Sequence, residues 1–368
     1  MKKTSKIIGI CCSIILAVIL IYQMFTVDGK NNGIARIALS ALLLWIFYSI
    51  YRSFIHRPKE EQCEKKESLN HSITQNLNVT EKVKKTKRIV DELKRRTLCP
   101  CYKLHINRER CPALTDTKLG GLPYWDCIQP YPTDINGNPM MLLAQINFTN
   151  NPMGEPLPKE GLLQFFIAED EENYSYGCDF ENHANQENFR IVYHHKIDDT
   201  ITKEQIIALN LPTCEKSQSA PFYNEYALDV MQGDSAINVE VGTFDKVFND
   251  VINDLFGESL NGKHWLHYSA YKKDFDYFID SLTDQNNFQI LGYPTFVQYD
   301  PREIKDGTTY YDTVLLQIPT IEAEKEDKNN HDNFYVIWGD CGIANFLINQ
   351  EDLKRLDFSN VFYNWDCS

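Results

Sequence analysis

Two long apolar runs near the N-terminus constrain this chain more than any other feature. The first covers residues 7–25 and contains no charged side chain. The second covers residues 34–55, with Arg36 and Arg52 near its two ends, where long basic side chains can reach lipid headgroups. An α-helix of about 20 apolar residues spans the hydrocarbon core of a bilayer. The sequence therefore predicts a transmembrane helical hairpin over residues 1–57, in contact with a lipid bilayer through both runs.

The basic residues around these runs predict how the hairpin is oriented. They gather at its two outer ends, whereas the turn between the runs contains a single one: Lys2, Lys3, Lys6, Arg52, Arg57 and Lys59 at the ends, and Lys30 in the turn. Lysine and arginine accumulate on the cytoplasmic side of membrane proteins. We therefore expect a multi-pass protein of the cell inner (cytoplasmic) membrane, with the globular domain and both termini in the cytoplasm. A cleaved signal peptide is the alternative, but no small-x-small cleavage pattern follows Phe25.

The net charge changes sign along the chain. Residues 1–60 contain eight Lys or Arg and two acids, which gives +6, and the whole chain carries −14, so residues 61–368 carry −20. Residues 58–98 are strongly polar, and they predict a charged linker followed by a basic helix that begins near Thr80. The acidic remainder repels phosphate backbones, which disfavours nucleic acid as a partner and permits a basic protein or a cation. The alternative is that the acidic surface only keeps the domain soluble.

Residues 99–368 have the composition of one globular domain. Apolar runs of strand length recur between clusters of Gly, Pro, Asn and Asp, at residues 141–148, 162–168, 189–194, 296–299, 313–318, 334–338 and 343–348. Helical periodicity is clearest at residues 244–256, with Thr243 as N-cap and Gly257 after the end, and shorter helices are expected after Thr202 and Asn349. Because strands and helices are mixed without a regular βαβ alternation, the predicted fold class is α+β.

A three-part pattern occurs twice in this domain. A Gly-x-Pro turn ends at Pro123, and Gln145 follows 22 residues later within an apolar strand. A second such turn ends at Pro294, and Gln317 follows 23 residues later, again within an apolar strand. A Gly-led apolar strand comes next in both copies. The repeat predicts an internal duplication that gives two related halves, although each piece is short enough for coincidence to be the alternative.

Six motifs of this domain resemble those of the YwqG-like family of bacterial proteins. They are Lys118-Leu-Gly-Gly-Leu-Pro-Tyr124, Leu143-Ala-Gln-Ile-Asn147, Gly161-Leu-Leu-Gln-Phe-Phe166, Gly292-Tyr-Pro-Thr-Phe296, Trp338-Gly-Asp-Cys-Gly-Ile-Ala-Asn-Phe346 and Tyr363-Asn-Trp-Asp-Cys367. The resemblance covers roughly residues 100–368 and implies a cytoplasmic globular α+β domain. It implies no activity, because that family is of unknown function. The N-terminal hairpin departs from the soluble form and makes this chain resemble a membrane-tethered version.

Standard catalytic and cofactor-binding motifs are absent from the sequence, so we predict no cofactor and no metal site. The polar residues that stand out, together with the aromatic residues beside them, lie inside or next to apolar strands: Gln145, Gln317, Asp300, Arg302, Trp338, Asp340, Trp365 and Asp366. The two glutamines either satisfy backbone groups within a sheet or line a cleft between two halves. The carboxylates beside aromatic rings either bind a partner or act as acids and bases, or they accept hydrogen bonds in turns.

Two classes of function follow from these observations. We favour a non-enzymatic protein-binding module at the membrane, such as one that neutralises a basic toxin domain, because the domain is acidic and lacks catalytic motifs. The alternative is an uncharacterised enzyme that uses the clustered residues Asp300, Asp340 and Asp366.

Overall fold

The computed structural model describes residues 81–368 except 171, 218, 269–281, 283–286 and 324–333. The predicted transmembrane hairpin at 1–57 and most of the predicted linker lie outside the described residues. Within the described ranges, no helix is both long enough and apolar enough to cross a membrane. The chain divides into two compact units, Met1–Asn78 and Val79–Ser368, and the second unit is described here.

This unit is built mainly from β-strands, so the α+β class predicted from the sequence is wrong. Ten strands form one antiparallel sheet in the order β12-β11-β8-β7-β1-β6-β2-β3-β4-β5. Their bounds are β1 Cys99–Asn107, β2 Lys118–Leu119, β3 Met141–Asn147, β4 Leu162–Ile167, β5 Phe189–His194, β6 Tyr226–Ser235, β7 Gln289–Leu291, β8 Thr313–Pro319, β11 Ile343–Ile348 and β12 Val361–Asp366. A separate two-stranded sheet pairs β9, Ile321–Glu322, with β10, Phe334–Val336.

The prediction failed because several strands carry no apolar run. Most positions of the long pair β1 and β6 are exposed or half-exposed, and the two short strands β2 and β7 contain only two and three residues. The apolar run at 296–299, predicted as a strand, is a loop. The helices that would have justified an α+β class are few and mostly short.

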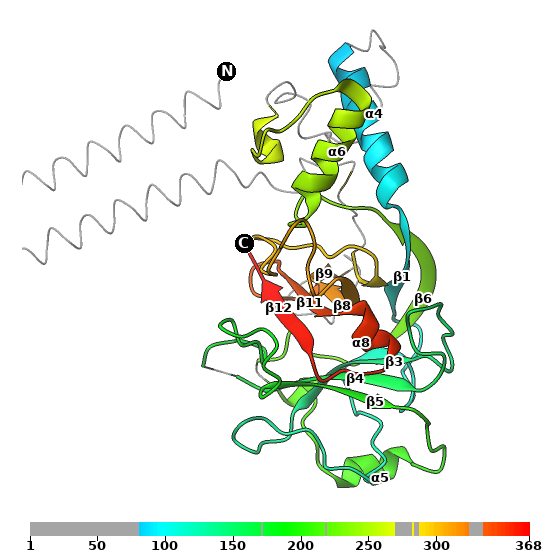
Figure 1. The fold of residues 1–368 in the computed structure, drawn as a ribbon. Helices are drawn as coiled ribbons and strands as arrows, with labels where there is room; N and C mark the ends of the chain where they lie inside the picture. Colours follow the sequence, from blue (N-terminus) through cyan, green and yellow to red (C-terminus); the bar gives the residue numbers. More distant parts are fainter. Residues whose placement is uncertain (1–80, 171, 218, 269–281, 283–286, 324–333) are drawn as a thin grey trace, which may run out of the picture. The chain divides into compact units, whose positions relative to one another are not determined.

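The described helices are α4, Glu81–Thr97, α5, Lys203–Ala208, α6, Phe244–Phe256, and α8, Gln350–Lys354. The prediction for α6 is confirmed, including Gly257 after its end, where φ is +66° and glycine avoids the steric cost of a side chain. The predicted capping box of α5 is also confirmed, because Thr202 and Gln205 exchange both hydrogen bonds. The apolar stripe of α4 packs against α6 in a cluster of its own (Figure 1).

The strands on the two sides of the central pair β1–β6 are arranged in the same way. On one side lie β2, β3, β4 and β5, which we call the N-terminal wing, and on the other lie β7, β8, β11 and β12, which we call the C-terminal wing. In each wing a very short strand comes first, and it is followed by two long buried strands and an edge strand. Positions in one wing therefore have counterparts in the other that the strand pairing defines.

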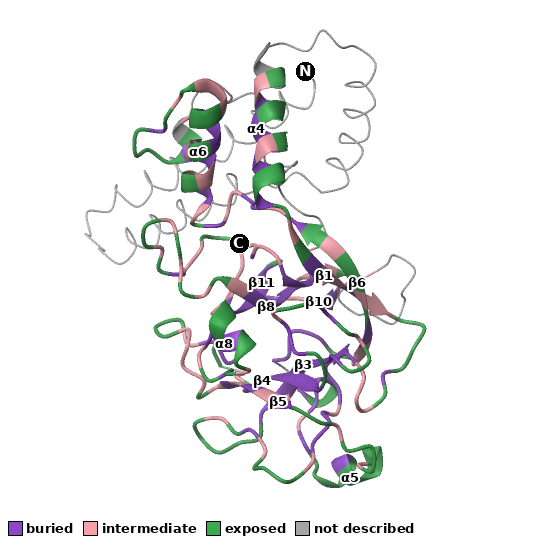
Figure 2. Cartoon of the chain, turned by 45° about the vertical axis from the view of Figure 1, so that its right-hand side comes forward, coloured by how far each residue is buried: buried purple, intermediate pink, exposed green. Residues whose placement is uncertain are grey.

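The core lies where the two wings face each other. The ring of Phe165 on β4 lies 5.0 Å from that of Phe346 on β11, and the edge strands approach through Phe189 and Tyr363, whose rings are 5.2 Å apart. Strands β3, β4 and β11 are buried at every position (Figure 2). Because protein covers both faces of a buried strand, the polar side chains on that strand need hydrogen-bond partners inside the fold.

Candidate functional site

A buried polar row crosses each wing at constant register. In the N-terminal wing, it consists of neighbouring residues on β2, β3 and β4, namely Lys118, Gln145 and Gln164. In the C-terminal wing, the corresponding residues on β7, β8 and β11 are Gln289, Gln317 and Asn345. None of the six side chains reaches the surface, since their residues are at most 2% exposed. The repeated pattern of the sequence thus marks two sets of buried hydrogen-bonding groups.

Gln145 and Gln317 hold corresponding loops against the sheet. Gln145 accepts a hydrogen bond from the backbone N–H of Tyr124 at 3.2 Å and donates to the carbonyl oxygens of Leu114 and Asp116, both at 2.9 Å. Gln317 accepts from the backbone N–H of Thr295 at 2.7 Å and donates to a backbone carbonyl. Both glutamines, predicted as site residues, satisfy backbone groups and do not reach solvent.

The first residue of each row closes the turn that follows it. Lys118 donates to the carbonyl oxygen of Leu122 at 2.6 Å, and Gln289 donates to that of Tyr293 at 2.8 Å, four residues on in both cases. Burial lowers the pKa of the Lys118 ammonium to about 8. Because Lys118 is buried and bonded to carbonyl oxygens, it is not available to an external anion.

The row of the N-terminal wing continues into a histidine. Gln145 Oε1 accepts from a backbone N–H, so its polarity is fixed, and it also accepts from Gln164 Nε2 at 2.8 Å. Gln164 Nε2 donates in addition to the carbonyl oxygen of Tyr124 at 2.8 Å, and Gln164 Oε1 therefore faces His194 Nε2 at 3.0 Å. An amide oxygen can only accept, so the hydrogen of the neutral His194 ring lies on Nε2.

The other ring nitrogen of His194 is left as an acceptor. Nδ1 lies 3.6 Å from Oδ2 of Asp126, and the His194 side chain is only 2% exposed. Burial lowers the pKa of His194, while the charge of Asp126 opposes this shift only in part. The Nδ1 lone pair of the neutral His194 ring therefore faces a carboxylate oxygen of Asp126. This arrangement attracts a hydrogen-bond donor, above all one that is positively charged.

Both His194 and Asp126 line a pocket of about 670 Å³, which we call the His194 pocket. Its walls come from the loop after β2 and from the segment after β5, and its charged residues are Asp126, Asp198, Asp199 and Lys196. Two tyrosines, Tyr124 and Tyr193, also line it. The Tyr124 hydroxyl accepts from the backbone N–H of Asp198 at 2.9 Å, and that of Tyr193 donates to the carbonyl oxygen of Glu160 at 2.6 Å. Both rings are thus held in place.

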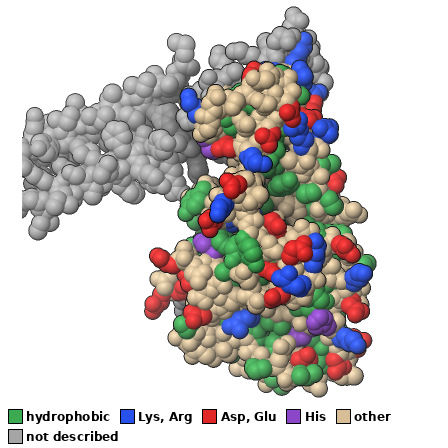
Figure 3. Space-filling view, viewed as in Figure 1, with side chains coloured by type: hydrophobic (Ala, Val, Ile, Leu, Met, Phe, Trp, Pro, Cys, Tyr) green, Lys and Arg blue, Asp and Glu red, His purple; other side chains and the backbone are tan. Residues whose placement is uncertain are grey.

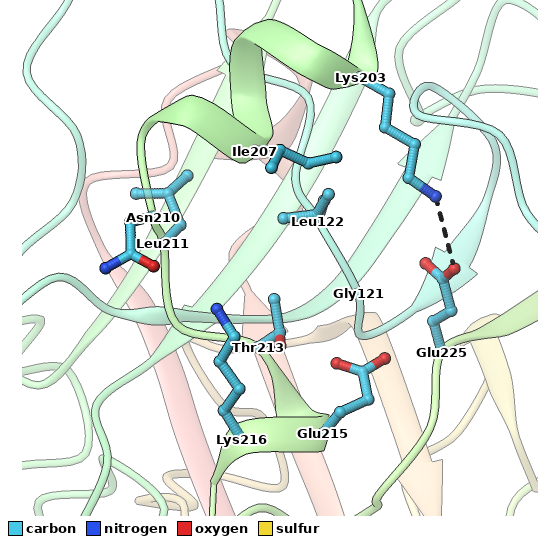
Figure 4. Close-up of a pocket in the computed structure, with 10 residues that line it drawn as sticks. All are labelled: Gly121, Leu122, Lys203, Ile207, Asn210, Leu211, Thr213, Glu215, Lys216 and Glu225. Carbon is cyan, nitrogen blue, oxygen red and sulfur yellow. Dashed lines mark ion pairs between the residues drawn. The ribbon is translucent and has the colours of Figure 1, made fainter.

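A second pocket, of about 280 Å³, lies beside α5 and the turn after β2 (Figure 4). Its charged side chains are two lysines and two glutamates, and Lys203 points across it toward Glu225 with a distance of 4.0 Å between the charged groups. The charges balance, and the Lys203 side chain is 53% exposed. This pocket has no buried ionisable group comparable to His194 in its lining, and we take the His194 pocket as the candidate site.

The remaining predicted site residues differ in burial and in their hydrogen-bond partners. Asp300 and Arg302 form an ion pair at 2.6 Å with both side chains 3% exposed, and Arg302 also donates to the carbonyl oxygen of Tyr311. Trp338 is buried in the core, whereas Asp340 is exposed. The Trp365 indole donates to the carbonyl oxygen of Ser175 at 2.8 Å.

Asp366 accepts two backbone hydrogen bonds, from Val297 at 2.8 Å and Gln298 at 2.7 Å, and burial raises its pKa. Of the three predicted aspartates, only Asp340 is an exposed residue, whereas Asp300 and Asp366 are half-buried. Acidic and basic side chains are also interspersed over the face seen in Figure 3, without one large acidic patch.

The sequence analysis did not single out His194, Asp126 or Gln164 as site residues. Two signals were present: a histidine that ends an apolar strand, and a second glutamine within the Gly-led strand that follows Gln145. Neither signal shows by itself that the side chains meet, because the contacts join residues 19 to 68 positions apart in the chain.

A family model described as a domain of unknown function (DUF1963) matches residues 117–367, a range that includes both polar rows and the His194 pocket. No curated protein matches the chain.

Proposed function

The chain belongs to the DUF1963 family, a family of unknown function, and from this premise we propose that its β-rich unit is a protein-binding module that takes a basic side chain of a partner into the His194 pocket. The observation that carries this proposal is the pair of facing acceptors, His194 Nδ1 and Asp126 Oδ2. Lysine and arginine side chains carry only donors, so their charged groups can bond both acceptors at once.

The charges around the pocket support a cationic occupant. Three carboxylates, those of Asp126, Asp198 and Asp199, stand against the single lysine Lys196. A charged pair in a partly desolvated pocket attracts more strongly than one on an open surface, because solvent screens it less. The pocket therefore favours a basic group over an acidic or an apolar one.

The fixed tyrosines favour the same occupant. A cation within about 6 Å of an aromatic ring face is attracted by the ring, and this attraction grows as water is excluded. Because hydrogen bonds hold the Tyr124 and Tyr193 hydroxyls, their rings lose little freedom when a ligand enters.

The finer predictions of the sequence are part of this proposal. A basic toxin domain would be one partner of the proposed kind, and attachment through residues 7–25 and 34–55 would hold the module at the cytoplasmic side of the inner membrane, as in a membrane-tethered YwqG-like protein. The alternative enzyme has less support, because the Asp300 carboxylate is occupied by Arg302 and by the backbone N–H of Gly242.

The proposal can be tested with short peptides as probes. We expect the peptide Gly-Gly-Lys-Gly-Gly or its arginine counterpart to bind the full chain in saturation-transfer NMR, and Gly-Gly-Gln-Gly-Gly not to bind. Asp126→Asn should weaken this binding about tenfold or more, since it removes the negative charge of one of the two acceptors.

Asp250→Asn is the matched control, because it makes the same change of net charge at an exposed position on α6. It should bind as the unchanged chain does. Equal binding of the glutamine peptide, or equal weakening by both variants, would reject a basic side chain as the occupant of the pocket.

A further inference from the structure

The C-terminal wing ends its polar row in a different way. On β5, His194 lies opposite Leu162, two residues before Gln164, and on β12, Asp366 lies opposite Ile343, two residues before Asn345. Asp366 is therefore the counterpart of His194. Where the N-terminal wing places a donor next to the row, the C-terminal wing places a carboxylate.

This exchange leaves acceptors without donors. In the described part of the chain, three buried side-chain oxygens of this region have no hydrogen-bond partner, namely Asn345 Oδ1, Asp366 Oδ1 and Glu240 Oε2. Asn345 is fully buried, and its Nδ2 donates to the carbonyl oxygen of Thr295 at 2.9 Å. A buried oxygen without a donor is destabilising, and a positive species bound to all three would offset this cost.

Two of the three side chains lie against one loop. Asp366 Oδ2 accepts from the backbone N–H groups of Val297 and Gln298, and Asn345 Nδ2 donates to the carbonyl oxygen of Thr295, so both side chains contact residues 295–298. Asn345 Oδ1 is the counterpart of Gln164 Oε1, which faces His194, and Asp366 is the counterpart of His194. From this correspondence we infer that Asn345 Oδ1 faces Asp366.

Glu240 completes the group from the segment after β6. The segment of Glu240 lies against the same loop, because Asn238 donates to the carbonyl oxygen of Pro294 at 2.8 Å and the backbone N–H of Gly242 donates to Asp300. Burial and, second to it, the charge of Asp366 raise the pKa of Glu240 to about 7. The basic side chain of the neighbouring segment, Arg302, is already bonded to Asp300 and to the carbonyl oxygen of Tyr311. It therefore does not neutralise Glu240 and Asp366.

We propose that Glu240, Asp366 and Asn345 form a binding site for a hard divalent cation of the calcium type. Two carboxylates and an amide oxygen are the ligands that such cations prefer, and further oxygens from backbone or water commonly complete the shell. The described residues contain no group of three His, Cys, Asp or Glu side chains placed to hold a metal ion, and here the third ligand is an amide. All-oxygen ligation favours calcium or magnesium over zinc or copper.

The experiment uses the full chain after treatment with EDTA and removal of the chelator. Addition of about 10 mM CaCl₂ should raise the midpoint of thermal unfolding by about 3–6 °C, because a ligand that binds only the folded state stabilises it. Isothermal titration should give one calcium per chain. Glu240→Gln and Asp366→Asn should abolish both effects, whereas Glu303→Gln, at an exposed position, should keep them.

A second variant protects the test against loss of folding. Asn345→Asp adds a third carboxylate and should tighten calcium binding about tenfold, since affinity rises with the ligand charge. No calcium effect on the unchanged chain would show that the two carboxyl groups only share a proton, and it would reject the site. Equal calcium effects in all variants would place the ion elsewhere and reject it as well.

Discussion

The two wings of the sheet use the same frame and end in opposite chemistry. Each wing has a short strand, a buried polar row and a glutamine that holds a loop, but one row ends at His194 and the other at Asp366. An imidazole supplies the hydrogen that its row needs, whereas a carboxylate adds one more acceptor. One residue at the edge of each buried row therefore determines whether the acceptors of that row have donors within the fold or, as we propose, require a bound cation.

The largest expected effect concerns what the wings share. Gln145→Leu and Gln317→Leu should each destabilise the fold by about 3–5 kcal/mol, because each leaves several buried backbone groups without a partner. Denaturant unfolding followed by tryptophan fluorescence measures the loss. Gln232→Leu, at an exposed position on β6, is the control and should change stability by less than about 1 kcal/mol. A large loss of stability for only one of the two variants would contradict the equivalent role of the two glutamines.

A smaller effect, a dependence of stability on pH, is expected from Glu240, which lies beside the C-terminal wing. The folded state raises the pKa of Glu240 from 4.5 to about 7, so its contribution to stability is fully present below pH 4.5 and is lost as the pH rises through 7. Without calcium, Glu240→Gln should be more stable than the unchanged chain at pH 8, by on the order of 1–3 kcal/mol, and not at pH 4.5. Denaturant unfolding at both pH values measures this. A constant difference would contradict it.

The smallest expected effect concerns the N-terminal wing, where the dependence of stability on pH should have the opposite sign. The folded state lowers the pKa of His194 below 6.5, so its contribution is present above pH 6.5 and is lost as the pH falls below it. His194→Gln keeps a donor for Gln164 but does not titrate, and it should lose less stability than the unchanged chain between pH 6.5 and 5, by about 1 kcal/mol. His195→Gln, at the exposed next residue, should retain the normal pH dependence.

Sequence reasoning located the parts of the fold whose signals are local. The apolar runs that became β3, β4, β5, β8 and β11 were recognised because buried strands are nearly continuous in apolar residues. The long pair β1–β6 was missed because its charged and polar residues, such as Lys103 and Asp229, lie on half-exposed or exposed strand faces. Without these strands the predicted sheet is smaller than the observed one, and helices make up a larger share of the predicted elements, which led to the α+β class.

None of the predicted site residues lines the His194 pocket, and Gln145 is linked to His194 only through Gln164. Gln145 and Gln317 stood out because an amide inside an apolar strand is unusual, and the structure places both in the polar rows. The pairing of His194 with Asp126 depends on where a loop returns over the sheet, which no short pattern contains. Asp300 and Arg302 were recognised as charged residues beside apolar runs, but their mutual ion pair is visible only in three dimensions.

The fixed direction of the hydrogen bonds in the N-terminal row has an electrical consequence. From His194 to Gln164 to Gln145 to the carbonyl oxygens of Leu114 and Asp116, every donor points inward and every acceptor points back toward the pocket. Three side-chain dipoles are thus aligned head to tail, with their negative ends toward His194 Nδ1. Aligned dipoles polarise one another in a low-dielectric interior. The sheet itself therefore places a negative pole at the pocket, and part of its attraction for a cation should survive when the Asp126 charge is removed.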